Sequence, residues 1–264
     1  MNGTPSDRPG YLNQMFGLTG SVAVVSGGTS GLGAAVATGL AAAGAHVVVL
    51  GRDEDRGQAV VAAATEAAGS AEFRRVDVRR PEEITRIAAQ VLSTHGAVDI
   101  LVNAAGISPT SPAIDITLDE WESVFDINVR ATFLMCQAFG RHMIARGSGK
   151  IVNFASTDAL VGVPELVTYA ASKGAVVQIT RSLAAEWIKH GVNVNCVAPT
   201  EFATPMTAPL MDDLAYQSWV EATIPIGRVG QPPELVGAVL FLVAPSSSMV
   251  VGHTLLVDGG RTII

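Results

Sequence analysis

The sequence predicts a single-domain α/β protein, a doubly wound parallel sheet of the Rossmann type with helices on both faces. Short β-branched runs alternate along the chain with alanine-rich stretches of helical length, which is the order of a parallel sheet connected by helices. The runs are continuously apolar, as in strands buried on both faces. Right-handed crossovers between such strands then place helices on both sides of the sheet.

The expected elements follow one another at regular spacing. The strand candidates are residues 21–26, 46–50, 73–76, 98–103, 150–155, 192–197 and 254–257, and the helix candidates are residues 31–43, 54–68, 81–95, 119–145, 169–190 and 232–243. Residues 200–230 interrupt this order with Pro205, Pro209 and Pro225 and with a candidate short helix at 210–222. A long insertion in a compact domain is usually functional, so we expect a lid or substrate loop there.

Composition narrows the class of protein further. The 264 residues fit one domain over residues 1–264, and 48% hydrophobic with 16% charged residues excludes a disordered chain. A net charge of −7 argues against a nucleic-acid partner, because phosphate binding needs a basic surface. Cys136 and Cys196 are too few for a disulfide framework, so we expect a reducing compartment, the cytoplasm. We expect neither a leader in residues 1–20 nor a membrane span, since glycines interrupt the most apolar stretch, residues 34–50.

A glycine-rich turn follows the first predicted strand and opens the first predicted helix, in the order Ser-Gly-Gly-Thr-Ser-Gly-Leu-Gly at residues 26–33. Gly27 permits a tight turn, Gly31 lets the backbone approach a pyrophosphate, and Gly33 lets the helix pack close to the sheet. The helix N-terminus then offers N–H groups to the phosphates. A plain surface turn is the alternative, and the position between strand and helix favours dinucleotide binding.

The spacing Gly-x-x-x-Gly-x-Gly resembles the short-chain dehydrogenase/reductase family, with Ser26 in place of the usual threonine. Four further segments resemble that family in order and spacing: Asn-Ala-Ala-Gly at 103–106, Tyr169 with Lys173, Pro199 with Thr204, and Val-Asp-Gly-Gly at 257–260. Ala104 and Thr200 depart from the family pattern. The resemblance implies cofactor contacts by Gly27, Thr29, Ser30, Gly31, Leu32, Gly33, Arg52, Asp77, Val78, Asn103, Ala104, Gly106, Tyr169, Lys173, Pro199, Phe202 and Thr204.

The end of the second predicted strand bears on the choice of nucleotide. Gly51 stands where the family usually carries an acidic residue for the ribose of NAD, and Arg52 follows it. An arginine there suits the 2′-phosphate of NADP, so we expect NADP(H). NAD stays open, because Ser30 replaces a second basic residue of many NADP-dependent relatives and Asp53 is a candidate ion-pair partner of Arg52.

Tyr169 and Lys173 are four residues apart and therefore share one face of a predicted helix. A free tyrosine has a pKa of about 10 and is a poor base near neutrality. We expect the nearby ammonium group, with the positive nicotinamide of an oxidised cofactor, to lower that pKa. The phenol would then donate a proton in carbonyl reduction and accept one in alcohol oxidation. A surface pair is the alternative, although Tyr169 is one of three tyrosines and Lys173 one of three lysines.

Two more residues match catalytic positions of the family. Ser156 lies thirteen residues before Tyr169, where a hydroxyl would hydrogen-bond the substrate oxygen; a loop or helix-cap serine is the alternative. Asn128 matches the family's fourth catalytic member, credited there with supporting a water-linked proton path through the lysine. Its alternative is a satisfied core asparagine.

These features predict an NAD(P)-dependent oxidoreductase that interconverts a secondary alcohol and a ketone on a small-molecule substrate. Residues 185–191 and 202–204 look like segments of gluconate 5-dehydrogenases, which favours a sugar acid or polyol. A 3-oxoacyl thioester reductase and a catalytically silent dinucleotide-binding sensor are the alternatives. Arg228 is a candidate clamp for a substrate carboxylate, although we favour a structural role for it.

The remaining expectations concern assembly and metals. Residues 121–144 and 169–189 are long and apolar enough for the helix contacts of a homotetramer or homodimer, which the resemblance implies. The five histidines show no metal-ligand spacing, so no metal is expected.

Overall fold

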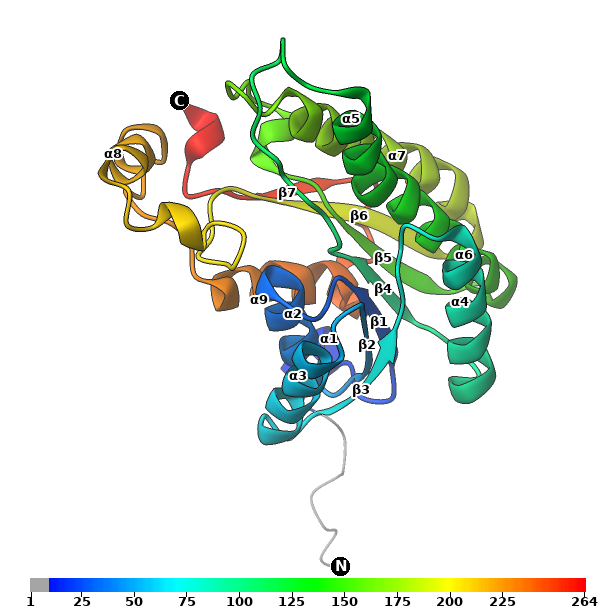
Figure 1. The fold of residues 1–264 in the computed structure, drawn as a ribbon. Coiled ribbons are helices and arrows are strands. Elements are labelled where there is room, and N and C mark those ends of the chain that lie inside the picture. Colours follow the sequence, from blue (N-terminus) through cyan, green and yellow to red (C-terminus); the bar gives the residue numbers. More distant parts are fainter. Residues whose placement is uncertain (1–9) are drawn as a thin grey trace, which may run out of the picture.

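The computed structural model describes residues 10–264 and confirms the predicted doubly wound α/β fold (Figure 1). Within the described residues, seven strands form one sheet in the order β3-β2-β1-β4-β5-β6-β7, and neighbouring strands are parallel. The order reverses between β1 and β4, which is where such sheets bind ligands. The strands are β1 (Val22–Ser26), β2 (His46–Gly51), β3 (Ser70–Arg75), β4 (Ile100–Asn103), β5 (Gly149–Phe154), β6 (Val192–Pro199) and β7 (Thr254–Val257). Residues 1–9, part of the stretch in which no leader is expected, lie outside the described residues.

Helices cover both faces of the sheet. Ala23 and Val25 of β1 lie in the core beneath α2 and α9, whereas Val24 lies in the core beneath α4 and α6. Figure 1 shows α2, α3 and α9 on one side of the sheet and α4, α6 and α7 on the other. None of the described helices is long and apolar enough to cross a membrane. The helices are α1 (Tyr11–Phe16), α2 (Gly31–Ala42), α3 (Glu54–Glu66), α4 (Pro81–His95), α5 (Leu118–Phe125), α6 (Ala131–Arg146), α7 (Val167–Trp187), α8 (Leu214–Thr223) and α9 (Pro232–Val243).

The two edge strands depart from the predicted burial. Burial on both faces is confirmed for β1, β2, β4, β5 and β6. It is wrong for β3 and β7, because each has a neighbour on one side only. The predicted range 73–76 is corrected to Ser70–Arg75, since the charged side chains of this edge strand hid its apolar pattern.

Two helical predictions also need correction. The single helix expected at 119–145 is divided into α5 and α6 by a π-helical segment, Asp126–Arg130, which contains Asn128. Helix α1 was not predicted, because none of its residues is buried and it therefore has no apolar periodicity. The short helix expected at 210–222 is α8.

A chain of buried amides fastens α7 to the centre of the sheet. The Asn103 side chain on β4 donates to Asn153 Oδ1 on β5 at 2.9 Å and to Cys136 Sγ on α6 at 3.3 Å. Asn153 in turn donates to Thr180 Oγ1 on α7 at 2.9 Å. All four side chains are buried, so each hydrogen bond replaces one to water that folding has removed. The network therefore fixes the position of α7, which carries Tyr169 and Lys173.

We expect Asn153→Ala to lower the free energy of unfolding by about 2–3 kcal/mol, because it leaves buried partners on β4 and α7 unsatisfied. Urea denaturation at fixed protein concentration measures the change. Thr94→Ala serves as the control, because it removes an exposed hydrogen bond, from the Thr94 hydroxyl to the Gln90 carbonyl oxygen on α4. We expect this substitution to change the free energy of unfolding by no more than about 0.5 kcal/mol. Equal effects of the two substitutions would show that the network does not hold α7.

Candidate active site

A cavity of about 290 Å³ opens at the carboxyl ends of the central strands. Most of the predicted cofactor residues line it: Gly27, Thr29, Ser30, Gly31, Leu32, Gly33, Arg52, Asp77, Val78, Ala104, Gly106, Tyr169, Lys173, Pro199 and Thr204. Pro205 and Met206 of the predicted lid line it as well. Sequence reasoning missed other lining residues, of which Arg79 is the one that carries charge.

The glycine turn leaves no room for side chains. Gly27 has a φ of +69°, and a Cβ there would lie 2.5 Å from the backbone nitrogen of Ala105. A Cβ on Gly33 would lie 2.2 Å from the Gly27 carbonyl oxygen. Only glycine therefore allows β1, the start of α2 and the end of β4 to come this close.

The N-terminus of α2 is open toward the cavity. Its N-cap, Ser30, makes no side-chain cap hydrogen bond, and the first turn contains no acidic residue. By contrast, Asp53 caps α3 and Thr117 caps α5 through side-chain oxygens. The amide groups of the first α2 turn, together with the helix dipole, thus form an uncompensated site for an anion.

The ion pairs at the ends of β2 and β3 differ from the predicted pair of Arg52 and Asp53. Asp53 does not pair with Arg52; it caps α3 and forms an ion pair with Arg56 at 3.2 Å. Arg52 lines the cavity and has no hydrogen bond or ion pair among residues 10–264, although its charge attracts Asp77 and helps to lower the pKa of that carboxyl. Asp77 is bound instead by Arg79, whose hydrogen bonds are the main reason that the pKa of this carboxyl falls to about 2.

Two predicted cofactor residues do not reach the cavity. The Asn103 side chain belongs to the buried amide network described above. The Phe202 ring is 4% exposed and packs on Gly230, while its carbonyl oxygen accepts a hydrogen bond from Thr207. Ala104, next to Asn103, and Thr204, two residues after Phe202, line the cavity instead.

Tyr169 and Lys173 lie side by side, as the spacing predicts. Lys173 Nζ is 5.5 Å from the centroid of the Tyr169 ring and donates to the Phe154 carbonyl oxygen at 2.8 Å. Burial lowers the pKa of Lys173 to about 8. Burial also raises the pKa of Tyr169, and the nearby Asp158 and Glu201 carboxylates add to this rise. The direction without a cofactor is thus opposite to the predicted lowering, which concerned the phenol beside both Lys173 and an oxidised nicotinamide and stays a prediction.

Ser156 and Asn128 are both buried beside this pair without lining the cavity. Ser156 Oγ accepts from the Asp158 backbone N–H at 3.1 Å. The Asn128 side chain accepts from Ile107 N and donates to Ile107 O and Ser172 Oγ, each at 2.9 Å. Asn128 thus joins the segment after β4 to α7, which agrees with the expectation of a satisfied core asparagine.

A second cluster of charge lies next to Tyr169, and sequence reasoning missed its cation. Arg261 and Asp158 are each 7% exposed and form an ion pair at 3.4 Å. The guanidinium stacks 4.7 Å from the Trp219 ring, and its Nη1 has no hydrogen-bond partner among the described residues. Arg261 and Trp219 line a second cavity, of about 340 Å³, with residues 161–164. Arg261 lies three residues from the chain end, and only the fold brings it here.

Arg228 is not part of either cavity lining. It donates to both carboxylate oxygens of Glu234 at 2.8 Å, at the start of α9. This pairing agrees with the favoured expectation of a structural role for Arg228 and leaves the clamp without support.

The comparisons with known proteins agree with this architecture. A family model described as enoyl-(acyl carrier protein) reductase matches residues 26–262. Gluconate 5-dehydrogenase of Gluconobacter oxydans is 40% identical over 94% of this chain and 97% of its own length. Galactitol 2-dehydrogenase (L-tagatose-forming) of Cereibacter sphaeroides is also 40% identical, over 94% of this chain and 98% of its own.

A solved structure extends the match to three dimensions. The gluconate 5-dehydrogenase of Burkholderia cenocepacia, crystallised with NADP and tartrate, is 36% identical, covers 96% of this chain and 100% of its own, and superimposes with a TM-score of 0.92. The relatives and the solved structure match nearly the whole chain. The chain therefore belongs to the short-chain dehydrogenase/reductase family, the NAD(P)-dependent oxidoreductases that act on CH–OH groups.

Proposed function

We propose that this enzyme interconverts a secondary alcohol and a ketone of a sugar acid or a related polyol, with NADP(H) as cofactor. One observation carries the proposal: Tyr169 and Lys173 line the same cavity as the glycine turn and the Arg52 side chain. A proton-transfer pair and an anion site in one cleft suit a reaction that moves a hydride and a proton together.

The cavity fits a dinucleotide on the chemistry of its walls. The uncapped first turn of α2 suits the pyrophosphate, and Arg52 with Arg79 at the cavity wall suits a 2′-phosphate. Ala104 and Gly106 would let the cofactor pass close to the end of β4. When bound, the nicotinamide supplies or accepts the hydride.

Tyr169 acts as the proton donor in ketone reduction. Because burial raises its pKa, the phenol is fully protonated near neutral pH and has a proton to give. In alcohol oxidation the phenol must accept a proton, and the Lys173 charge near the ring reduces the cost of the phenolate. The hydrogen bond from Lys173 to Phe154 O keeps that charge in place.

Ser156 and Asn128 support this step in different ways. Ser156 Oγ accepts the Asp158 backbone N–H, and its hydroxyl also interacts with the Tyr169 phenol and the Asp158 carboxylate, which by itself lowers the pKa of both groups. A substrate carbonyl oxygen beside Tyr169 would therefore lie within reach of the Ser156 hydroxyl, which would polarise it. Asn128 acts as a positioning residue, because its three hydrogen bonds hold α7 against the segment after β4.

The charged cluster beside Tyr169 favours a polar substrate. Arg261 lines the second cavity, and its buried Nη1 has no hydrogen-bond partner among residues 10–264; a guanidinium with an unused donor suits the carboxylate of a sugar acid. The Asp158 and Glu201 carboxylates influence Tyr169 electrostatically and so lie near it; they can accept hydrogen bonds from substrate hydroxyls. The relatives named for gluconate and galactitol support the same substrate class.

A 3-oxoacyl thioester reductase is the second candidate, supported by the 3-oxoacyl-(acyl-carrier-protein) reductase of Chlamydia pneumoniae, which is 37% identical over 93% of this chain and 98% of its own length. The buried Asp158–Arg261 pair weighs against it. An acyl chain packed on these charges would remove their remaining hydration without replacing it. A silent sensor has less support still, since the relatives are named as enzymes.

Assembly and location are also part of the proposal. Trp121, Phe133 and Val167 expose apolar surface on α5, α6 and α7, which supports a homodimer or homotetramer joined through these helices; sedimentation equilibrium distinguishes the two. Cys136 and Cys196 are free and buried, which supports a reducing compartment, and we place the enzyme in the cytoplasm.

Arg52→Ala should lower kcat/KM for NADPH by at least about tenfold and leave the value for NADH within about twofold, because the guanidinium contacts only the 2′-phosphate. Steady-state kinetics with both nucleotides measures this. Arg56→Ala, an exposed arginine already paired with Asp53, is the control and should change neither value. An unchanged NADPH preference in Arg52→Ala would refute the assignment to NADP.

Arg261→Gln should raise the KM for gluconate by about 10- to 100-fold, while the KM for galactitol, which has no carboxylate, changes much less. Arg228→Gln is the matched control and should leave both values unchanged. The double variant Asp158→Asn with Arg261→Gln leaves no unpaired buried charge, so it separates a binding defect from a folding defect. Parallel losses with both substrates in the double variant, or no turnover of gluconate by the wild type, would contradict the sugar-acid proposal.

A further inference from the structure

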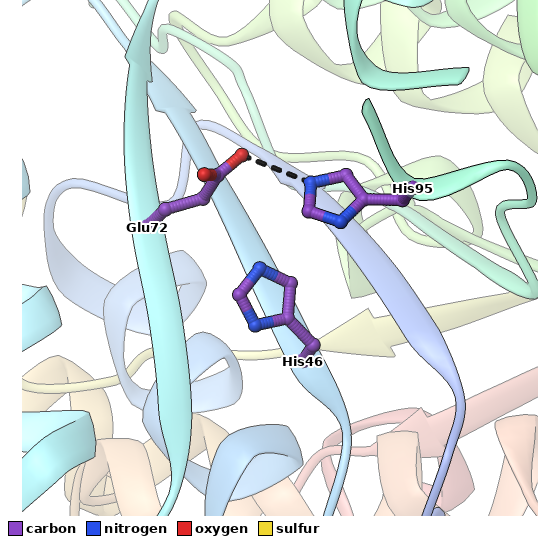
Figure 2. Close-up of side chains that lie close together, drawn as sticks. All are labelled: His46, Glu72 and His95. Carbon is purple, nitrogen blue, oxygen red and sulfur yellow. Dashed lines mark hydrogen bonds and ion pairs between the residues drawn. The ribbon is translucent and has the colours of Figure 1, made fainter. Parts of the chain in front are cut away.

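Two histidines and a glutamate that are far apart in the sequence meet near the amino ends of β2 and β3, away from the cleft. His46 begins β2, Glu72 lies within β3, and His95 ends α4. His46 pairs with Ser70 in the sheet register, so Glu72, two residues further on, projects from the same face as His46. Helix α4 packs on that face and brings His95 to the pair (Figure 2).

The side chains converge on one point. One potential ligand atom from each residue lies within 4.8 Å of the others. His95 Nε2 is 3.1 Å from Glu72 Oε1, and the two imidazole rings are 4.8 Å apart between centroids. The histidines show no metal-ligand spacing in the sequence, yet the fold brings His46 and His95 together.

His46 has an unused nitrogen that faces the other two residues. Its Nδ1 is 2.7 Å from Ser70 Oγ. Its Nε2 is buried and has no hydrogen-bond partner among the residues described, and Figure 2 shows a nitrogen of this ring turned toward the Glu72–His95 pair. An orphaned buried polar atom is costly, and a ligand at this point would remove the cost.

The donor set indicates the class of ligand. Two imidazole nitrogens with one carboxylate oxygen suit Zn²⁺ or a similar divalent transition metal. Ser70 provides the outer hydrogen bond that orients a metal-binding imidazole.

One contact opposes metal binding. Arg74 donates to both Glu72 oxygens, at 3.1 and 3.2 Å. Its side chain is 44% exposed, so it can turn into solvent and keep its charge hydrated. Arg74 is therefore a competitor for Glu72 that weakens the site without blocking it.

We propose that His46, Glu72 and His95 bind one divalent transition-metal ion, Zn²⁺ in the first place, with water completing the coordination shell. Ligand bonds of about 2.0–2.2 Å require the donor atoms to close to about 3.3–3.6 Å, a movement that side-chain rotation supplies. The ion would tie β2, β3 and α4 together. Because the site lies away from the catalytic cleft, its role is to stabilise the fold of the half that carries Arg52 and Asp77.

Isothermal titration of untagged, EDTA-treated protein with ZnCl₂ tests the proposal. We expect one saturable site per chain and, at saturation, a rise in melting temperature of about 5 °C. His46→Gln and His95→Gln should each weaken binding at least tenfold. His142→Gln is the matched control, since His142 also has a buried Nε2 without a partner among the described residues but no neighbouring ligands.

Arg74→Gln tests the site by a gain in zinc affinity, which a misfolded protein would not show. It removes the competitor for Glu72, so zinc should bind severalfold more tightly than to the wild type. The proposal would be overturned if zinc showed no saturable binding to the wild type, or if the wild type, His46→Gln and His95→Gln bound zinc with equal affinity. An affinity unchanged by Arg74→Gln would exclude Glu72 from the site.

Discussion

The chemistry of the cleft depends on one buried ammonium group. Lys173 is 5% exposed, and its Nζ is held by the Phe154 carbonyl at the end of β5. Removing this charge from water is expensive, which is why its pKa falls to about 8. The position is maintained because α7 is fastened to the sheet at two levels, by the Asn103–Asn153–Thr180 network and by Asn128 near the helix start. Tyr169 gains its orientation from the same helix.

The sheet separates two kinds of site. Its carboxyl edge combines an open helix N-terminus, arginine side chains and the proton-transfer pair, all suited to a charged cofactor and a polar substrate. Near the amino ends of β2 and β3, the histidines and Glu72 have no access to that cleft, so the proposed metal would influence stability rather than turnover. Both sites use the same property of a parallel sheet, which aligns equivalent ends of distant strands at one edge.

Sequence patterns predicted whatever depends on local order. The glycine turn, the Tyr169–Lys173 spacing and the bounds of α4, α9 and β7 followed from short-range periodicity and motif spacing. Long-range contacts were beyond reach. Only the fold brings Arg261 to Asp158. Only the packing of α4 on the sheet brings His95 to His46. Asp53 forms an ion pair with Arg56 instead of its neighbour Arg52, because its side chain caps the helix that carries Arg56. The pKa of Tyr169 depends on burial, which spacing does not reveal.

In the proposed mechanism, the Tyr169 hydroxyl transfers the proton, whereas other groups bind the dinucleotide. Tyr169→Phe removes that one atom and keeps the ring packed beside Lys173. Fluorescence titration with NADPH, combined with single-turnover oxidation of the bound NADPH by a keto sugar acid, measures both halves of the claim. We expect Tyr169→Phe to bind NADPH with a Kd within about twofold of the wild-type value and to oxidise the bound NADPH at a rate at least about 10³-fold lower. Turnover at the wild-type rate would contradict it.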